Sequence, residues 1–189
     1  MDSVARGTLI NLATRLVAVV LGLAITLYTA RLGPTQQGAF ALFTAVEAVL
    51  LALGSGFGVA IARRISHHGE RPGGLVAASV LACVAGGVLV GAGLLAMSVA
   101  AGGAYEALAL LALAAPLMFV TPNLAGLWLG SGRMAALARL TLGAPLLTLA
   151  GIALAALLGL PPALMVVLWA WVLARLIVAA AVLVAAAHG

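Results

Sequence analysis

Six long apolar stretches follow one another along this 189-residue chain, and they constrain its fold more than any other feature. A helix rises about 1.5 Å per residue, so about 20 apolar residues are enough to cross the roughly 30 Å hydrocarbon core of a membrane. The sequence therefore predicts an all-α, polytopic membrane helical bundle. We expect a single six-helix lobe over residues 1–189, with spans at approximately 8–30, 38–62, 75–101, 105–129, 140–159 and 163–187.

The composition agrees with a membrane protein and argues against several other classes. Hydrophobic residues make up 66% of the chain and charged residues 7%. All nine basic residues are arginines scattered between apolar spans, a pattern unlike the basic stripes of nucleic-acid-binding proteins. Cys83 is the only cysteine, so we expect neither a disulfide framework nor a cysteine-rich metal site, and no cofactor. The run 8–30 is longer than the apolar region of a secretion signal, about 7–15 residues, and we interpret it as a retained first span.

The positions of the arginines predict the orientation in the membrane. Arginines that flank a span are retained preferentially in the cytoplasm. If six spans alternate, only Arg31 lies in a connection on the side opposite the N-terminus. We therefore predict that both termini face the cytoplasm, together with Arg6, Arg63, Arg64, Arg71, Arg133 and Arg139.

The first span carries a polar face. At about 100° per residue, one arc of roughly 60° holds Thr8, Asn11, Arg15, Gly22, Thr26 and Thr29. A polar stripe gains nothing from lipid, so it should face protein or a watery cavity. Asn11, Arg15 and Thr26 are therefore candidate substrate-binding residues. The alternative for Arg15 is snorkelling, because its long side chain is close enough to the predicted cytoplasmic end to reach the headgroups.

Two other charges lie inside predicted spans. Glu47 should either pair with an arginine, for example Arg15 or Arg31, or stay protonated, as an ion- or proton-coupling group requires. Arg175 has long apolar runs on both sides, so snorkelling cannot easily rescue it. Its insertion cost, about 2.5–3.5 kcal/mol, should be offset by an anionic ligand in a central cavity or by pairing with Glu47.

Small residues and prolines inside the spans predict how the helices pack. Gly54 and Gly58, like Gly87 and Gly91, are four residues apart and allow helix backbones to approach closely. We expect Gly22 to act in the same way. Prolines inside spans should kink helices or supply hinges, and they occur at Pro116, Pro122 and Pro145.

The sequence does not favour an enzyme. Membrane enzymes need clustered carboxylates, a Ser/His pair or metal ligands near one interface, and none of these patterns occurs. His67 and His68 lie in a charged connection, where a solvated loop explains them better than a metal site. The tryptophans are expected mainly to pack, with stacking on a sugar as the alternative, and they are Trp128, Trp169 and Trp171.

Two segments carry a family resemblance. The opening GTLINLATRLVAVVLGLAITLYTARLGPTQQGAFALFTAVEAVLLALGSGFGVAIARRI resembles the N-terminus of polysaccharide-transporter (oligosaccharide) flippases. These belong to the multidrug/oligosaccharidyl-lipid/polysaccharide (MOP) exporter superfamily. Within the opening, ARLGPTQQGAFAL is similar to the family's first periplasmic turn. Further on, GLWLGSGRMAALARLTLGAPLLTLAGIALAALLGLPPA is similar to its fourth-to-fifth helix segment, and the resemblance covers nearly all of the chain.

The resemblance implies a function and a location. It implies that an undecaprenyl-pyrophosphate-linked oligosaccharide crosses the bacterial cytoplasmic (inner) membrane by alternating access, with membrane lipids as the other partner. Arginines in the cavity would hold the pyrophosphate. In the related lipid II flippases a cavity arginine follows a small hydroxyl residue in the first helix, and Thr14-Arg15 is similar to that position. Arg175 and Glu47 are inferred from their depth alone.

The chain departs from the family in length. Family members have two homologous lobes of about six helices each, whereas six predicted spans fill this chain. We expect a truncated N-terminal lobe, or else a half-transporter that associates with a second copy or a partner lobe. A drug or cation exporter of the same superfamily (MATE-like) is an alternative, although it would favour acids over arginines in its cavity. A non-transporting membrane scaffold of polysaccharide assembly is another.

Overall fold

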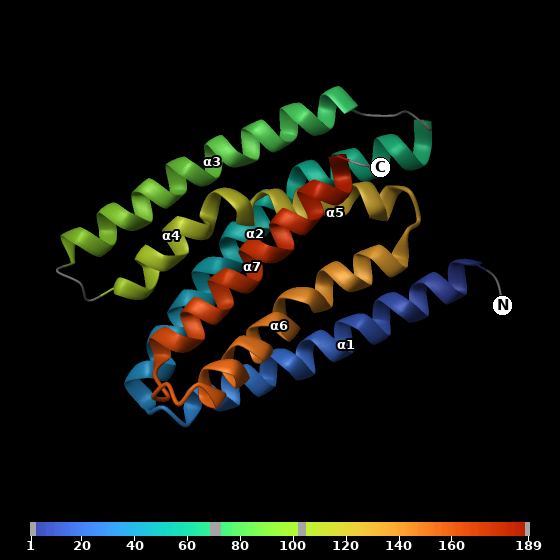
Figure 1. Ribbon diagram of the computed structural model, residues 1–189. Helices are drawn as coiled ribbons and strands as arrows, with labels where there is room; N and C mark the ends of the chain where they lie inside the picture. Colours follow the sequence, from blue (N-terminus) through green and yellow to red (C-terminus); the bar gives the residue numbers. More distant parts are fainter. Residues whose placement is uncertain (1–2, 69–72, 102–104, 188–189) are drawn as a thin grey trace.

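The computed structural model describes residues 3–68, 73–101 and 105–187, and the regular elements in these ranges are all α-helices (Figure 1). Six helical segments there are long and apolar enough to cross a membrane, with α4 and α5 together forming the fourth. The predicted all-α class and six spans are thus confirmed. The helices are α1 (Ser3–Ala30), α2 (Pro34–His68), α3 (Gly73–Ala100), α4 (Glu106–Met118), α5 (Val120–Gly130), α6 (Met134–Leu157) and α7 (Leu164–Ala187).

Several helices extend beyond their predicted spans, and the starts of α6 and α2 each have a physical reason. α6 begins at Met134 rather than near 140, because arginine is a good helix former and the side chain of Arg139 is exposed at the surface. α2 begins at Pro34 rather than near 38, since the first helical position does not need the N–H that proline lacks. The apolar composition of a segment indicates the length of helix within the membrane, and the helical backbone continues beyond that length.

The fourth span is broken between α4 and α5 at Phe119, as its prolines predict. Pro116 has no N–H to donate to the carbonyl of Ala112, four residues earlier. That carbonyl lies against Gly91 of α3, where a Cβ atom would be only 2.7 Å from the oxygen. The close approach of α3 therefore covers the backbone group that the proline leaves without a helical partner.

Close helix packing depends on the paired glycines. α2 packs mainly on α5, and α3 on α4, while α1 packs on α6 and α6 on α7. A Cβ on Gly58 would lie 2.5 Å from the carbonyl oxygen of Pro122, and one on Gly87 would lie 2.5 Å from the Cα of Pro116. The prediction for Gly22 was wrong, because no atom lies within 4 Å of its Cβ position. Gly22 borders open space between α1, α6 and α7 instead of a helix contact.

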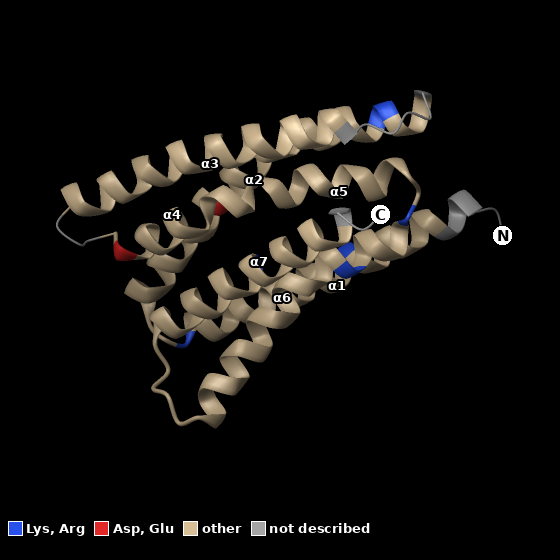
Figure 2. Ribbon diagram, turned by 45° about the horizontal axis from the view of Figure 1, so that its top comes forward, with Lys and Arg blue, Asp and Glu red and all other residues tan. Residues whose placement is uncertain are grey.

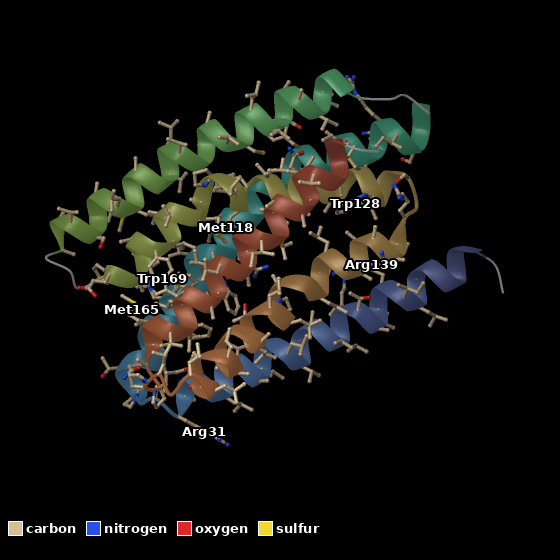
Figure 3. The ribbon with its side chains drawn as sticks, viewed as in Figure 1. Arg31, Met118, Trp128, Arg139, Met165 and Trp169 are labelled. Atoms are coloured by element: carbon tan, nitrogen blue, oxygen red, sulfur yellow. The ribbon has the colours of Figure 1, made fainter. Side chains whose placement is uncertain are left out.

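Consecutive spans run in opposite directions, so the two ends of the described chain lie at the same end of the bundle (Figure 1). Figure 2 shows most of the basic positions toward that end. Figure 3 shows Arg31 at the opposite end, beside the turn between α1 and α2. Arg71 lies outside the described residues. The arrangement matches the arginine asymmetry of the sequence, and the cytoplasmic location of the arginine-rich end stays a prediction.

Cysteine labelling of intact cells measures this orientation. We expect a membrane-impermeant maleimide to label Thr35→Cys, at the end with Arg31, and to label Ser131→Cys only after permeabilisation. Both native side chains are exposed. Unsubstituted protein is the control, since Cys83 is buried and should stay unlabelled. The reverse labelling pattern would place the N-terminus outside.

Two glutamines join three helices at the end with Arg31. Gly33 adopts a φ of 111°, which breaks α1 and turns the chain into α2. The Thr29 hydroxyl donates a hydrogen bond to Gln37 Oε1 at 2.7 Å, across the turn. The backbone N–H of Leu164 donates to Gln36 Oε1 at 3.1 Å, which satisfies a free N–H in the first turn of α7. This end of α1, α2 and α7 is thus fixed by side chains as well as by loops.

Candidate ligand-binding cleft

A buried ion pair joins α2 to α7. Arg175 Nε lies 2.7 Å from Glu47 Oε1, and the side chain of Glu47 is only 4% exposed while that of Arg175 is 27% exposed. This pairing is one of the two alternatives that the sequence leaves open for Arg175. Neither Arg15 nor Arg31 is the partner of Glu47. The carboxylate lies behind the guanidinium, which remains partly open.

Aromatic rings support the ion pair. Arg175 Cζ lies 5.2 Å from the ring centroid of Trp171, one helical turn earlier on α7, within the range of a cation–π contact. Phe40 of α2 packs edge-on against the same ring, with centroids 5.7 Å apart and an interplanar angle of 85°. Glu47 Oε1 and Trp171 Nε1 are buried and form no hydrogen bond with good geometry in the described structure. The arrangement is therefore held by charge and ring packing.

The guanidinium of Arg175 keeps most of its donors free. Arginine has five N–H donors, and its ion pair engages Nε. No hydrogen bond joins the guanidinium to any other described residue. Arg175 also lines a cleft of about 270 Å³ between α1, α6 and α7. A permanently charged group with free donors thus faces space inside the membrane-spanning region.

Small residues open this cleft. Its walls are Ala18 and Gly22 from α1, Ala144 and Pro145 from α6, and Trp171 and Arg175 from α7, together with Thr141 and Thr148. Gly22 and Ala18 remove side-chain volume where a leucine would fill the space. Pro145 lacks the N–H that would bond the carbonyl of Thr141, so this backbone acceptor has no helical partner. Thr141 and the cationic Arg175 therefore line one space.

A much smaller polar space lies next to the cleft. It measures about 10 Å³, close to the least that a single water needs. Asn11 and Thr14 line it from α1, and Thr141 lines both spaces. The hydroxyls of Thr14 and Thr141 donate to carbonyls of their own helices, at 2.7 Å and 2.9 Å. Polar side chains thus continue from the cleft along the boundary between α1 and α6.

The three candidate binding residues of α1 have different surroundings in the structure. Asn11 lines the small polar space, whereas Arg15 is exposed and lines neither space. Arg15 nevertheless shares a stripe with Asn11, Ala18 and Gly22, because these positions follow a spacing of three and four residues. Thr26 is exposed, and its hydroxyl donates to the carbonyl of Gly22 at 2.9 Å. Arg15 therefore lies beside the cleft, and Thr26 lies farther round the helix.

Sequence reasoning missed several residues of the cleft. Thr141 and Thr148 were not candidates, although a polar residue within an apolar span is the signal that could have found them. Trp171 was expected to pack, and it does pack against the core, as does Trp128. Trp169 is exposed on α7 (Figure 3). In the part of the chain that the structure describes, no group of three or more His, Cys, Asp or Glu residues could hold a metal ion.

Comparison with known proteins gives a structural match but no sequence match. No family profile matches the chain, and no curated protein sequence matches it. A solved structure described as the outward-facing conformation of a multidrug resistance MATE family transporter of the MOP superfamily is similar, with a TM-score of 0.71 and 18% sequence identity. The match covers 95% of this chain and 43% of the transporter. The chain is a multi-pass membrane helical bundle with the fold of about half of a MOP-superfamily transporter.

Proposed function

We propose that this chain forms one half of a flippase that moves a lipid-linked oligosaccharide across the bacterial cytoplasmic membrane by alternating access, and that Arg175 and Arg15 bind the diphosphate of the lipid carrier. One observation carries the proposal. Arg175 lines a cleft in the membrane-spanning region and keeps free donors there. Arginine binds phosphate oxygens through paired N–H groups, which makes a phosphate a fitting ligand for this cleft.

The size of the cleft supports a headgroup rather than a whole substrate. Pockets for drug-sized ligands measure about 300–1,000 Å³. This cleft measures about 270 Å³, so it has room for a diphosphate but not for a whole lipid-linked oligosaccharide. The sugars and the apolar tail would lie outside it, along the surface of the lobe. Asn11 and Thr26 are the proposed polar contacts for sugar hydroxyls on α1, and Glu47 as an ion- or proton-coupling group stays a prediction.

A second half completes the proposed transporter. The chain spans less than half of the length of the transporter that it resembles. Alternating access requires two bodies that move against each other around a binding site. We propose that a second homologous lobe or a second copy of this chain supplies the other body.

A MATE-like exporter of organic cations is the second candidate. The similar structure is described as a multidrug transporter, and a buried acid beside a tryptophan is chemistry suited to a cation. The charge of the cleft favours the first candidate, because Arg175 is the only charged residue among the described residues that line it. A membrane scaffold without transport would need no ligand in the cleft at all.

Binding of farnesyl diphosphate to the purified chain in detergent tests the proposal. We expect the diphosphate to bind and uncharged farnesol to bind much less. Arg175→Ala should weaken diphosphate binding at least tenfold, because a hydrogen bond to a charged group contributes about 1.5–3 kcal/mol. Arg15→Ala should weaken it severalfold. Arg31→Ala, at the other end of the lobe, is the matched control and should change nothing.

The outcomes separate the candidates. Equal binding of farnesol and farnesyl diphosphate, or equal binding by all three variants, contradicts the diphosphate site. Tight binding of an organic cation such as ethidium to the unsubstituted chain, with no diphosphate binding, supports the exporter. Absence of binding by every probe is the result expected of a scaffold.

A further inference from the structure

Arg175 occupies a site built by two other side chains. Glu47 contributes a buried carboxylate at 2.7 Å, and Trp171 contributes the face of its ring at 5.2 Å. A carboxylate and an aromatic face are the two features by which proteins hold organic cations. Arg175 is thus bound by its own chain in the way that a free alkylguanidinium would be bound.

The site does not depend on Arg175 for its shape. Glu47 lies on α2 seven residues after Phe40, which is 3% exposed and packs edge-on against Trp171. This ring contact fixes the indole without involving the arginine. Removal of the Arg175 side chain beyond Cβ therefore leaves the carboxylate and the ring face in position, and opens them to the cleft that Arg175 lines.

Electrostatics gives the emptied site a preference for cations. Glu47 is 3% exposed, and a buried carboxylate without a counter-charge is costly in the membrane interior. With Arg175 in place the pair is neutral, and the positively charged guanidinium lines the cleft beside Trp171. Without Arg175 the wall facing the cleft would carry a carboxylate and a ring face.

We propose that Glu47 and Trp171 form a guanidinium-binding site that Arg175 fills from within the chain, and that Arg175 thereby determines whether the cleft accepts anions or organic cations. The anion half of this inference rests on the proposed function. The cation half stands on the ion pair, the ring contacts and the cleft alone.

Thermal unfolding of the purified chain in detergent, with and without ethylguanidinium, tests the site. Ethylguanidinium should raise the unfolding temperature of Arg175→Ala by about 2–4 °C at several times its dissociation constant, because it binds only the folded state. The unsubstituted chain should show no such rise, since its site is filled. Arg175→Ala/Glu47→Gln is the matched control and should show none either. Sodium chloride at the same concentration corrects for ionic strength.

Each result decides the inference. A rise confined to Arg175→Ala supports it. No rise in that variant, or an equal rise in the double variant, overturns it. If Arg175→Ala is not recovered folded, the yield of monodisperse protein purified with ethylguanidinium replaces the measurement, and a yield no better than with sodium chloride overturns the inference.

A readout of anion binding separates this inference from the proposed function. If the site is as described, ethylguanidinium should restore part of the farnesyl diphosphate binding that Arg175→Ala loses, because the guanidinium returns to the cleft. Stabilisation of Arg175→Ala by ethylguanidinium, without diphosphate binding by the unsubstituted chain, would uphold the cation site and reject the flippase substrate. Diphosphate binding without that stabilisation would do the opposite.

Discussion

Replacement of Gly58 with leucine is expected to abolish the folded bundle. A Cβ at this position would lie 2.5 Å from the carbonyl oxygen of Pro122 and 3.2 Å from that of Asn123, both backbone atoms of α5. Backbone cannot move aside as a flexible side chain can, so α2 and α5 would have to separate along their contact. We expect a loss of more than about 3 kcal/mol, beyond the usual cost of overpacking.

The measurement is the yield of monodisperse protein in detergent, with thermal unfolding of whatever is recovered. Gly56→Leu is the matched control. Gly56 lies on the same helix, two residues earlier, but is exposed and has no atom within 4 Å of its Cβ position. Equal stability of the two variants would mean that α2 and α5 do not pack as described.

Glu47→Leu is expected to be the most destabilising substitution at the cleft. It leaves the guanidinium of Arg175 without its counter-charge in the membrane-spanning region. Removal of one partner of a buried ion pair costs about 3–5 kcal/mol, and the partial exposure of Arg175 to the cleft places the expected loss near the lower value. Thermal or denaturant unfolding in detergent measures it.

The double variant Glu47→Leu/Arg175→Leu separates charge from packing. If the cost of Glu47→Leu comes from the orphaned arginine, replacement of both partners should recover most of the lost stability. Glu106→Leu is the control for loss of an acid, because Glu106 is exposed at the start of α4. Additive losses in the double variant would contradict a direct ion pair.

The membrane spans could be predicted from the sequence. For the contacts between spans, the sequence could only reduce the number of possible partners. Hydropathy acts on each segment independently, which is why the order and number of spans agree with the described helices. The sequence left two possible binding partners for Arg175, an anionic ligand or Glu47. The depth of Arg175 in its span could not decide between them. The choice depends on the rotation of α2 and α7 about their axes, which is set by nonlocal packing against α4, α5 and α6.

The cleft itself has no local signature. It exists because Gly22 of α1 faces Pro145 of α6, and nothing in either segment specifies that these two helices are neighbours. The polar arc of α1 includes Asn11, which lines a small space against α6, but also Arg15 and Thr26, which are exposed. An arc of roughly 60° covers both the packed face of a helix and its margin.

The two glutamines at the end with Arg31 have a consequence for motion within the lobe. They connect α1, α2 and α7 where the Thr29 hydroxyl donates to Gln37 and the Leu164 N–H donates to Gln36, so this end would be the pivot if α1 tilted. α1 has 28 residues and extends about 42 Å from it at about 1.5 Å per residue. A tilt of about 10° at the pivot would therefore move the arginine-rich end by about 7 Å. A small change of angle at the end with Arg31 would thus become a large displacement at the end where most of the basic positions lie.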